Sequence, residues 1–167
     1  RSAAGVIDLA WNASLSALSA FVPGVDGTAT VRGTLKGPTE DLALAVDAAV
    51  VAAVAGLPAQ PIDIGLRLSG LPRAPAGQLT ARGQVAGAPL RIAAKLALAP
   101  DGALRMGIET ADWKSVRLTG ALTLPPGAAL PLGRLQLRVA RLADLQAQLD
   151  QEVFGSVTAR IDTVATR

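Results

Sequence analysis

Hydrophobic and polar residues alternate along most of this chain. The clearest run, residues 62–68, places Ile62, Ile64, Leu66 and Leu68 on one side and polar or small residues between them. A period of two is typical of a β-strand with one apolar face, because successive side chains point to opposite sides of a sheet. The chain is therefore expected to be rich in such strands.

The same alternation recurs in several other segments. We take its apolar positions as candidates for the lining of an apolar groove, because they share one side of each predicted strand. These candidates are Ile7, Leu9, Leu42, Leu44, Ile62, Ile64, Leu66, Leu68, Leu90, Ile92, Leu96, Leu98, Val116, Leu118, Leu122, Leu124, Leu135, Leu137 and Val139.

Residues 41–50 fit two interpretations. Leu42, Leu44 and Val46 alternate with alanines and Asp47, as in a strand. Alanine is also the best helix former, so local propensity favours a helix. The alternation and the prolines at positions 38 and 58 favour the strand.

Two segments have the spacing of helices. Residues 12–21 carry Leu15, Leu18 and Phe21 at intervals of three, and residues 142–149 carry Leu142, Leu145 and Leu149 on one helical side. Both segments are short, so packing against the rest of the molecule would have to stabilise them. We expect one or two short helices beside the strands.

Proline and glycine mark the ends of the strands. The segments 37–38, 71–75, 100–102 and 124–127 all combine these residues. Pro100-Asp101-Gly102 stands between two apolar runs and indicates a hairpin. Strands at intervals of about ten residues with such turns predict an all-β antiparallel meander.

An internal repeat supports an elongated form. Residues 27–37 and 77–87 share a glycine, then Arg-Gly, then another glycine, and residues 154–162 form a partial third copy. Repeats of this kind predict units that stack on their neighbours, as in a solenoid. We therefore expect residues 1–167 to form a single β-rich segment of a longer repeat protein, with a curled, elongated sheet.

The composition argues against catalysis. The chain contains no Cys, His or Tyr, which removes the common nucleophiles, general bases and zinc ligands. Its carboxylates are mostly single, and no phosphate-binding loop is present. Gly33, Gly37, Gly83 and Gly87 are better explained as close-packing glycines within strands. We expect no enzyme activity, no cofactor and no metal site.

Charge and aromatic content give little sign of a nucleic-acid partner. The net charge is +3, the basic residues are scattered singly along the sequence, and only 2% of residues are aromatic. Nucleic-acid binding usually needs a basic patch, with stacking rings for single strands. Trp11 and Trp113 could anchor a membrane interface, but filling the interior of the fold is the favoured role.

The apolar strand faces must be buried against something. The predicted helices are too few to cover them, so the sheet is expected to form a sandwich, a barrel or a curled trough. The interior could be a closed dry core or an apolar groove for acyl chains or a partner's strands. The alternation alone leaves both possibilities open.

Five segments of the chain resemble one known family. Residues 77–92, 96–105 and 116–124, followed by residues 135–145 and 153–159, are similar to the TamB family of translocation and assembly module proteins and to the wider AsmA-like group. The likeness covers most of residues 27–162, and its motifs are strands with glycines. The Ala- and Arg-rich composition suggests a high-GC bacterial source.

This resemblance implies a specific function. Members of the family are anchored in the inner membrane of Gram-negative bacteria, extend through the periplasm, and form a long curled sheet with an apolar groove. They are linked to phospholipid transport between the membranes and to outer-membrane protein assembly with a partner barrel. The implied partners are phospholipid acyl chains and that barrel. The rivals are a scaffold that pairs its edges with client strands and a closed β-sandwich surface module.

Overall fold

The fold is an all-β sheet. The computed structural model describes residues 5–20, 25–54, 58–128, 130–146 and 151–163. Its elements are β1 (Val6–Leu15), η1 (Leu18–Ala20), β2 (Val25–Pro38), β3 (Leu42–Val54), β4 (Gln60–Leu71), β5 (Ala76–Val85), β6 (Ala88–Leu98), β7 (Leu104–Trp113), β8 (Val116–Leu124), β9 (Leu132–Val139), η2 (Leu142–Leu145) and β10 (Val157–Thr163).

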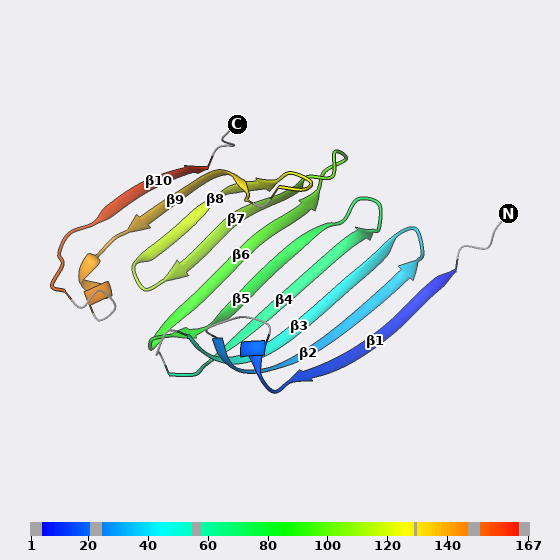
Figure 1. Cartoon of the computed structure of the whole chain (residues 1–167), viewed down its shortest axis with the longest axis horizontal. Coiled ribbons are helices and arrows are strands. Elements are labelled where there is room, and N and C mark those ends of the chain that lie inside the picture. Colours follow the sequence, from blue (N-terminus) through cyan, green and yellow to red (C-terminus); the bar gives the residue numbers. More distant parts are fainter. Residues whose placement is uncertain (1–4, 21–24, 55–57, 129, 147–150, 164–167) are drawn as a thin grey trace.

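All ten strands belong to one antiparallel meander. Their order in the sheet is their order in the sequence, from β1 to β10, so each strand pairs only with its neighbours along the chain (Figure 1). β1 and β10 form the two edges, and the sheet does not close on itself. The predicted antiparallel meander is therefore confirmed, and among the three predicted forms the sheet takes that of a curled trough.

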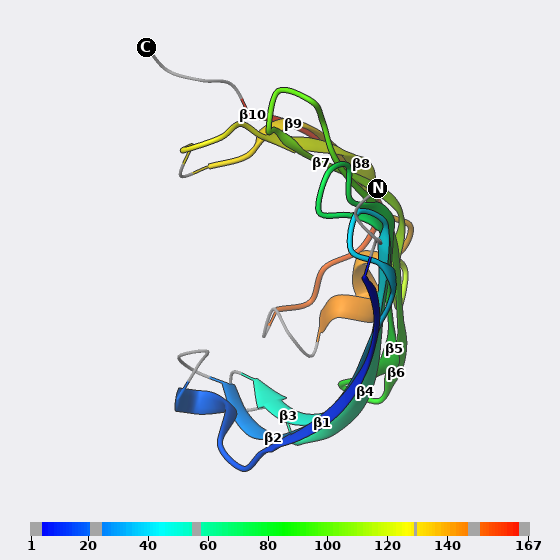
Figure 2. The same ribbon diagram turned by 90° about the vertical axis from the view of Figure 1, so that its right-hand side faces the viewer.

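The sheet is strongly curved, and viewed from its side it follows an open arc (Figure 2). Register shifts interrupt the β3–β4, β6–β7 and β7–β8 ladders, and such bulges bend a sheet. Gly120 and Gly133, in β8 and β9, have φ angles of 150° and 151°, and a side chain at either position would collide with the backbone of the neighbouring strand.

The hairpin turns follow the local sequence. Residues 42–50 lie in β3, so the strand interpretation of residues 41–50 is correct for all but Asp41. The Pro100–Gly102 turn joins β6 to β7, where the Asp101 carboxylate accepts a hydrogen bond from the Ala103 backbone N–H at 3.0 Å. Gly87, expected within a strand, lies instead in the β5–β6 turn with a φ of 73°, which is the conformation that this tight hairpin requires.

The predicted helix over residues 12–21 is wrong for most of its length. Residues 12–15 belong to β1, where Ala13 pairs with Val31 and Leu15 pairs with Ala29. Only the three-residue turn η1 is helical, and Phe21 lies outside the described residues. The local spacing of leucines gave way to strand pairing, because β1 forms backbone hydrogen bonds with β2 along its whole length.

The second predicted helix is present only at its start. η2 is a 3₁₀ helix at Leu142–Leu145, and residues 147–150 lie outside the described part of the chain. It follows β9 directly, and the Leu142 N–H donates to the Gly155 carbonyl at 2.9 Å. η2 thus sits beside the ends of β7, β8 and β9.

Candidate functional site

One face of the sheet is almost entirely apolar, and we call it the apolar face. The register shows how it forms: a single cross-strand row joins Leu9, Leu35, Leu44 and Leu68 through four successive strands. Within the described strands, only Gln60 and Thr163, both at strand ends, are polar on this face, and no residue on it is charged. The face runs without interruption from β1 to β10.

All nineteen predicted lining positions lie on the apolar face. The register carries one row from Ile64 through Ala81 and Ile92. It then continues through Ala111 to Leu118 and Leu137. The sequence therefore predicted which side of each strand is shared, although their role in lining a lipid groove stays a prediction.

Several residues on the apolar face were missed. They belong mainly to strands in which alanine, glycine or threonine interrupts the hydrophobic pattern, so alternation is weak there. Counting small residues as apolar would have found them. They include Leu15, Ala29, Val31, Leu35, Val50, Leu79, Val85, Met106, Ile108, Val157 and Ile161.

The apolar face lacks a covering layer in the part of the chain that the structure describes. Among the described elements, the extensive contacts of each strand are with the strands next to it, and those of η1 are with β2. Among the described residues, the buried ones are six alanines and Val139, and no large side chain is fully buried. Leu9 and Ile161 stay 52% and 45% exposed. An ordinary domain would bury such residues in a core.

The apolar face lies on the inner side of the curl. In β4 its residues are half-buried, whereas Asp63, Arg67 and Ser69 on the other face are exposed. With no second layer on either side among the described elements, curvature accounts for this difference. Side chains converge on a concave surface and shield one another, and they diverge on a convex one. We call the opposite, polar side the outer face.

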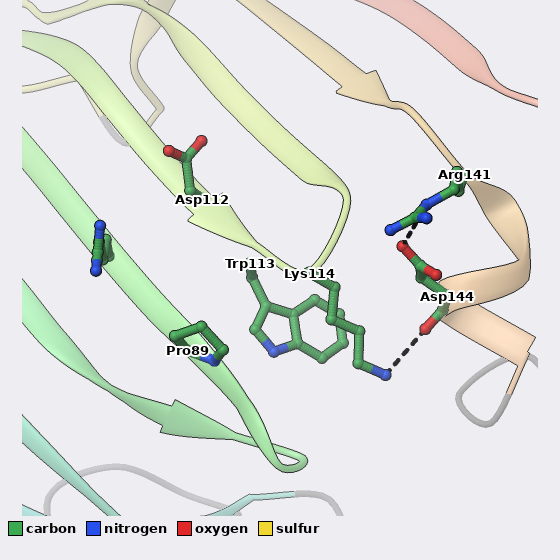
Figure 3. Close-up of a pocket in the computed structure, with 7 residues that line it drawn as sticks. Pro89, Asp112, Trp113, Lys114, Arg141 and Asp144 are labelled. Atoms are coloured by element: carbon green, nitrogen blue, oxygen red, sulfur yellow. Dashed lines mark hydrogen bonds and ion pairs between the residues drawn. The ribbon is translucent and has the colours of Figure 1, made fainter.

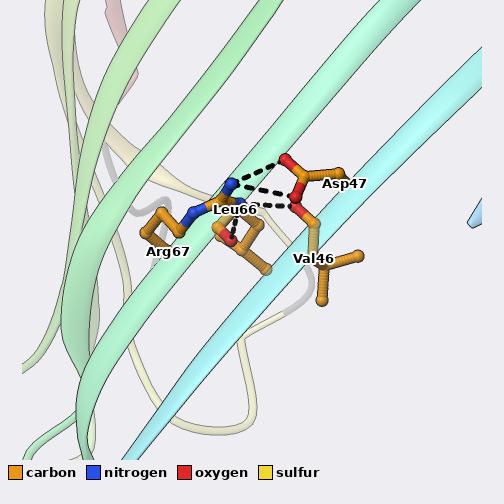
Figure 4. A network of polar contacts seen from close by, with 4 residues as sticks. All are labelled: Val46, Asp47, Leu66 and Arg67. Carbon is orange, nitrogen blue, oxygen red and sulfur yellow. Dashed lines mark hydrogen bonds and ion pairs between the residues drawn. The ribbon is translucent and has the colours of Figure 1, made fainter. Parts of the chain in front are cut away.

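Ion pairs join neighbouring strands on the outer face. Arg67 donates two hydrogen bonds to the Asp47 carboxylate, at 2.7 and 2.9 Å, and its other terminal nitrogen donates to the carbonyls of Val46 and Leu66 (Figure 4). Lys36 pairs with Asp8. Because these groups are more than half exposed, their ion pairs add little stability.

The outer face also gathers basic residues that are scattered in the sequence. Arg82 lies directly opposite Arg91, and Arg117 lies opposite Arg138, with Asp112 between the two pairs. The structure therefore brings together arginines that are far apart in the sequence, with no aromatic residue between them in this row. Hairpin register brings positions many residues apart onto one line, which a reading along the sequence does not detect.

Asp112 is the electrostatic centre of this row. A hydrogen bond from Arg117, at 2.8 Å, lowers the pKa of the Asp112 carboxyl, and the positive charge of Arg91 acts in the same direction. The same hydrogen bond raises the pKa of Arg117. Asp112 thus stays ionised, and the row keeps an excess of positive charge.

The two tryptophans occupy different surroundings. Trp11 is 36% exposed and lies against Gly33, where an added Cβ would come within 2.0 Å of the indole ring. The Trp113 indole N–H donates to the Val85 carbonyl at 2.8 Å, and the Lys114 ammonium lies 4.9 Å from the ring centre. Both belong to the apolar face by register. Neither enters a closed interior in the described structure.

Two further classes of site are absent from the described residues. No three His, Cys, Asp or Glu residues gather closely enough to hold a metal ion among the described residues. No described helix is long and apolar enough to cross a membrane. The apolar face and the basic row are therefore the features of this structure that bear on function.

Comparison with known proteins adds no relative to this chain. No family model, no curated protein and no solved structure matches it. The two faces of the sheet and the resemblance in the repeat strands are therefore the features from which a function can be proposed.

Proposed function

We propose that this chain is a segment of a TamB-like protein that spans the periplasm of a Gram-negative bacterium from an inner-membrane anchor. Its apolar face would shelter phospholipid acyl chains on their way between the inner and outer membranes, or support outer-membrane protein assembly beside a partner barrel. One observation carries the proposal: an uncharged apolar face crosses all ten strands and has no covering layer in the described residues.

The energetics favour an apolar guest. Each methylene group that leaves water contributes roughly 0.8 kcal/mol, so ten of them contribute about 8 kcal/mol. The same contact would remove exposed Leu9 and Ile161 from water. A surface without charges, with the polar side chains of Gln60 and Thr163 only at strand ends, holds acyl chains without fixing their position, which allows them to slide.

The mechanism is passive. The outer face stays hydrated through its arginines, aspartates and threonines, whereas the inner face provides a continuous low-polarity path across the strands. No bond is made or broken in such transfer. A gradient of lipid between the two membranes, or a partner at either end, would set the direction.

Site-specific photo-crosslinking tests the proposal. A photoreactive residue at Leu66, Ile92 or Leu118 should capture phospholipid in cells, because these positions lie in the middle of the apolar face. The matched controls, Arg67 and Lys95, sit on the same strands but point outward. Equal labelling of inner and outer positions would reject the lipid path.

A charge variant gives a second test. Leu66→Asp should reduce binding of a fluorescent phospholipid at least tenfold, because an ionised carboxylate on the apolar face strongly disfavours contact with acyl chains. The half-buried position lets the aspartate keep part of its hydration, so the fold should persist. Arg67→Gln is the control, and undiminished binding by Leu66→Asp would count against the proposal.

A scaffold for client strands is the second candidate. The observation in its favour is that β1 and β10 are edge strands, each with one side that lacks a partner strand within the described residues. Exposed edges pair with added strands through backbone hydrogen bonds. Crosslinks from positions 8 and 160 to an outer-membrane protein, without lipid capture at Leu66, would favour this candidate.

The closed sandwich module has no support in the open sheet. Solution scattering separates it from the other two candidates. A compact chain of 167 residues should have a radius of gyration of roughly 15 Å. We expect a clearly larger value at low protein concentration, and a value near the compact limit would favour a closed module.

A further inference from the structure

A cavity lies at the end of the sheet where the two faces meet, and we call it the rim cavity. It has a volume of about 580 Å³ and lies between the ends of β6 and β7 and the helix η2. Figure 3 shows Trp113 and Lys114 between Asp112 on one side and Arg141 and Asp144 on the other. Its chemically active lining residues are Arg91, Asp112, Trp113, Lys114, Arg141 and Asp144.

The lining combines the two faces of the sheet. Trp113 belongs to the apolar face, since it pairs with Leu90 and Val116. Arg91 and Asp112 form a register pair on the outer face. A ligand in the rim cavity could therefore touch charged groups with one end and the apolar face with the other.

Specific contacts hold this lining in place. The Trp113 indole N–H is bound to the Val85 carbonyl at 2.8 Å, and Lys114 lies over the ring. The Lys114 ammonium donates to the Asp144 backbone carbonyl at 2.9 Å, and the Asp144 carboxylate pairs with Arg141 at 3.3 Å (Figure 3). The chain of contacts connects the β5–β6 hairpin to η2, so the site is organised before any ligand enters.

Basic residues outnumber carboxylates in the described lining of the rim cavity. Three cations and two carboxylates line the rim cavity, and an adjoining cavity that shares Asp112 and Lys114 adds Arg117 and Arg138. The Asp112 carboxylate is bonded to Arg117. Arg91 has no ion pair within 4 Å in the described part of the chain. Among the described residues, the two adjoining cavities are together lined by five cations and two carboxylates, which favours an anionic ligand.

We propose that the rim cavity binds the phosphate group of a glycerophospholipid whose acyl chains lie on the apolar face. Guanidinium and ammonium groups are the usual protein partners of phosphate, and basic pockets beside apolar surfaces bind anionic headgroups. This inference rests on the proposed function, because it takes the acyl chains to lie on that face. It adds that the site selects a phosphate-bearing lipid at one end of the trough.

A lipid suits the rim cavity better than a nucleic acid does. A nucleic acid would need a series of aromatic rings along a basic path, and the rim cavity offers a single indole. That indole belongs to a face that continues as leucine, isoleucine and valine across the sheet. A phosphate joined to acyl chains matches both halves of the site.

The test measures the fluorescence of Trp113 in a Trp11→Phe background. Three probes are titrated: short-chain dihexanoyl phosphatidylglycerol below its micelle concentration, uncharged dihexanoylglycerol, and inorganic phosphate. The site variant is Arg91→Gln with Arg141→Gln. The control variant is Arg105→Gln with Arg160→Gln, which removes two outward arginines that do not line the cavity. Circular dichroism checks that each variant is folded.

We expect the site variant to bind the phospholipid at least tenfold more weakly and to bind dihexanoylglycerol unchanged. The control variant should bind both lipids like the parent. An unchanged phospholipid affinity in the site variant would overturn the proposal, and so would inorganic phosphate binding as tightly as the phospholipid. In either case the parent would still bind dihexanoylglycerol. If the parent failed to bind dihexanoylglycerol, the proposed function would be overturned instead.

Discussion

The first four strands and the last six share one apolar face but differ on the outer face. Strands β1–β4 carry three basic and four acidic residues, a net charge of −1. Strands β5–β10 carry eight basic and three acidic residues, a net charge of +5. The apolar face thus repeats along the sheet, whereas charge marks one end of it.

This difference indicates two separate constraints. A continuous inner face needs only apolar side chains at alternate positions, which both regions supply. The opposed pairs Arg82–Arg91 and Arg117–Arg138 place like charges side by side, which costs stability. Asp63 lies opposite Arg82, and Asp112 lies opposite both Arg91 and Arg117, so these aspartates offset part of that cost. The excess of arginines still makes the basic region the better candidate for recognition and the first region the candidate for plain shelter.

The largest effect on stability should come from a substitution at Gly83, one of two equivalent glycines of the internal repeat. A Cβ at Gly83 would lie 2.4 Å from the Pro61 carbonyl oxygen, a backbone atom that cannot move alone. Gly83→Ala should lower the free energy of unfolding by about 1–3 kcal/mol, as overpacking does. The change can be measured by urea denaturation.

Gly33→Ala is the matched variant in the first region. An added Cβ at Gly33 would meet the Trp11 ring, but this side chain is 36% exposed and can rotate away. We expect a loss of about 1 kcal/mol or less, because relaxation offsets the clash. Trp11→Ala should remove that loss, and a failure to do so would show that the backbone of β2, not the ring, limits this position.

The two tryptophans should also respond differently. Trp113→Phe removes the hydrogen bond to the Val85 carbonyl and should cost about 1 kcal/mol of unfolding free energy. Trp11→Phe removes no hydrogen bond found in the structure and should cost clearly less. Equal losses for the two variants, compared by urea denaturation, would contradict the distinction drawn between the regions.

A smaller effect is expected from reversing one charge in the basic row. Arg138→Glu turns the like-charged pair with Arg117 into an opposite-charged pair, so the midpoint of urea denaturation should rise slightly. The gain should shrink at high salt. Arg105→Glu is the control, since Ala97 and Thr123 flank Arg105 across the sheet. A gain of the same size in the control would point to net charge alone.

The smallest effect is expected for the pH dependence of stability at Asp112. Because the pKa of Asp112 is lowered in the folded chain, its ion pair contributes stability above the ordinary pKa of an aspartate and loses it as the pH falls through the lowered value. Asp112→Asn should therefore reduce stability slightly at pH 7 and leave it unchanged at the lowest pH at which the fold survives. Denaturation midpoints across this range provide the measurement, and a variant effect that does not depend on pH would contradict the ion pair's role.

The sequence predicted the fold better than it predicted the site. Alternation identified Leu66, Ile92 and Leu118 as residues of one face, because the period of a strand is local information. It failed at residues 12–15, where pairing with β2 overrides helical spacing. It also missed the row from Arg82 to Arg138, because cross-strand neighbours depend on register, and the bulge between Ile108 and Ala111 changes that register.

The simple strand order has a consequence for how this protein changes and folds. Every ladder joins strands that are consecutive in the chain, so any hairpin can form as soon as its two strands are available. A hairpin could also be added or deleted without breaking a distant contact, since the strands on either side would pair with each other in the same antiparallel sense. Evolution could therefore lengthen or shorten such a sheet two strands at a time.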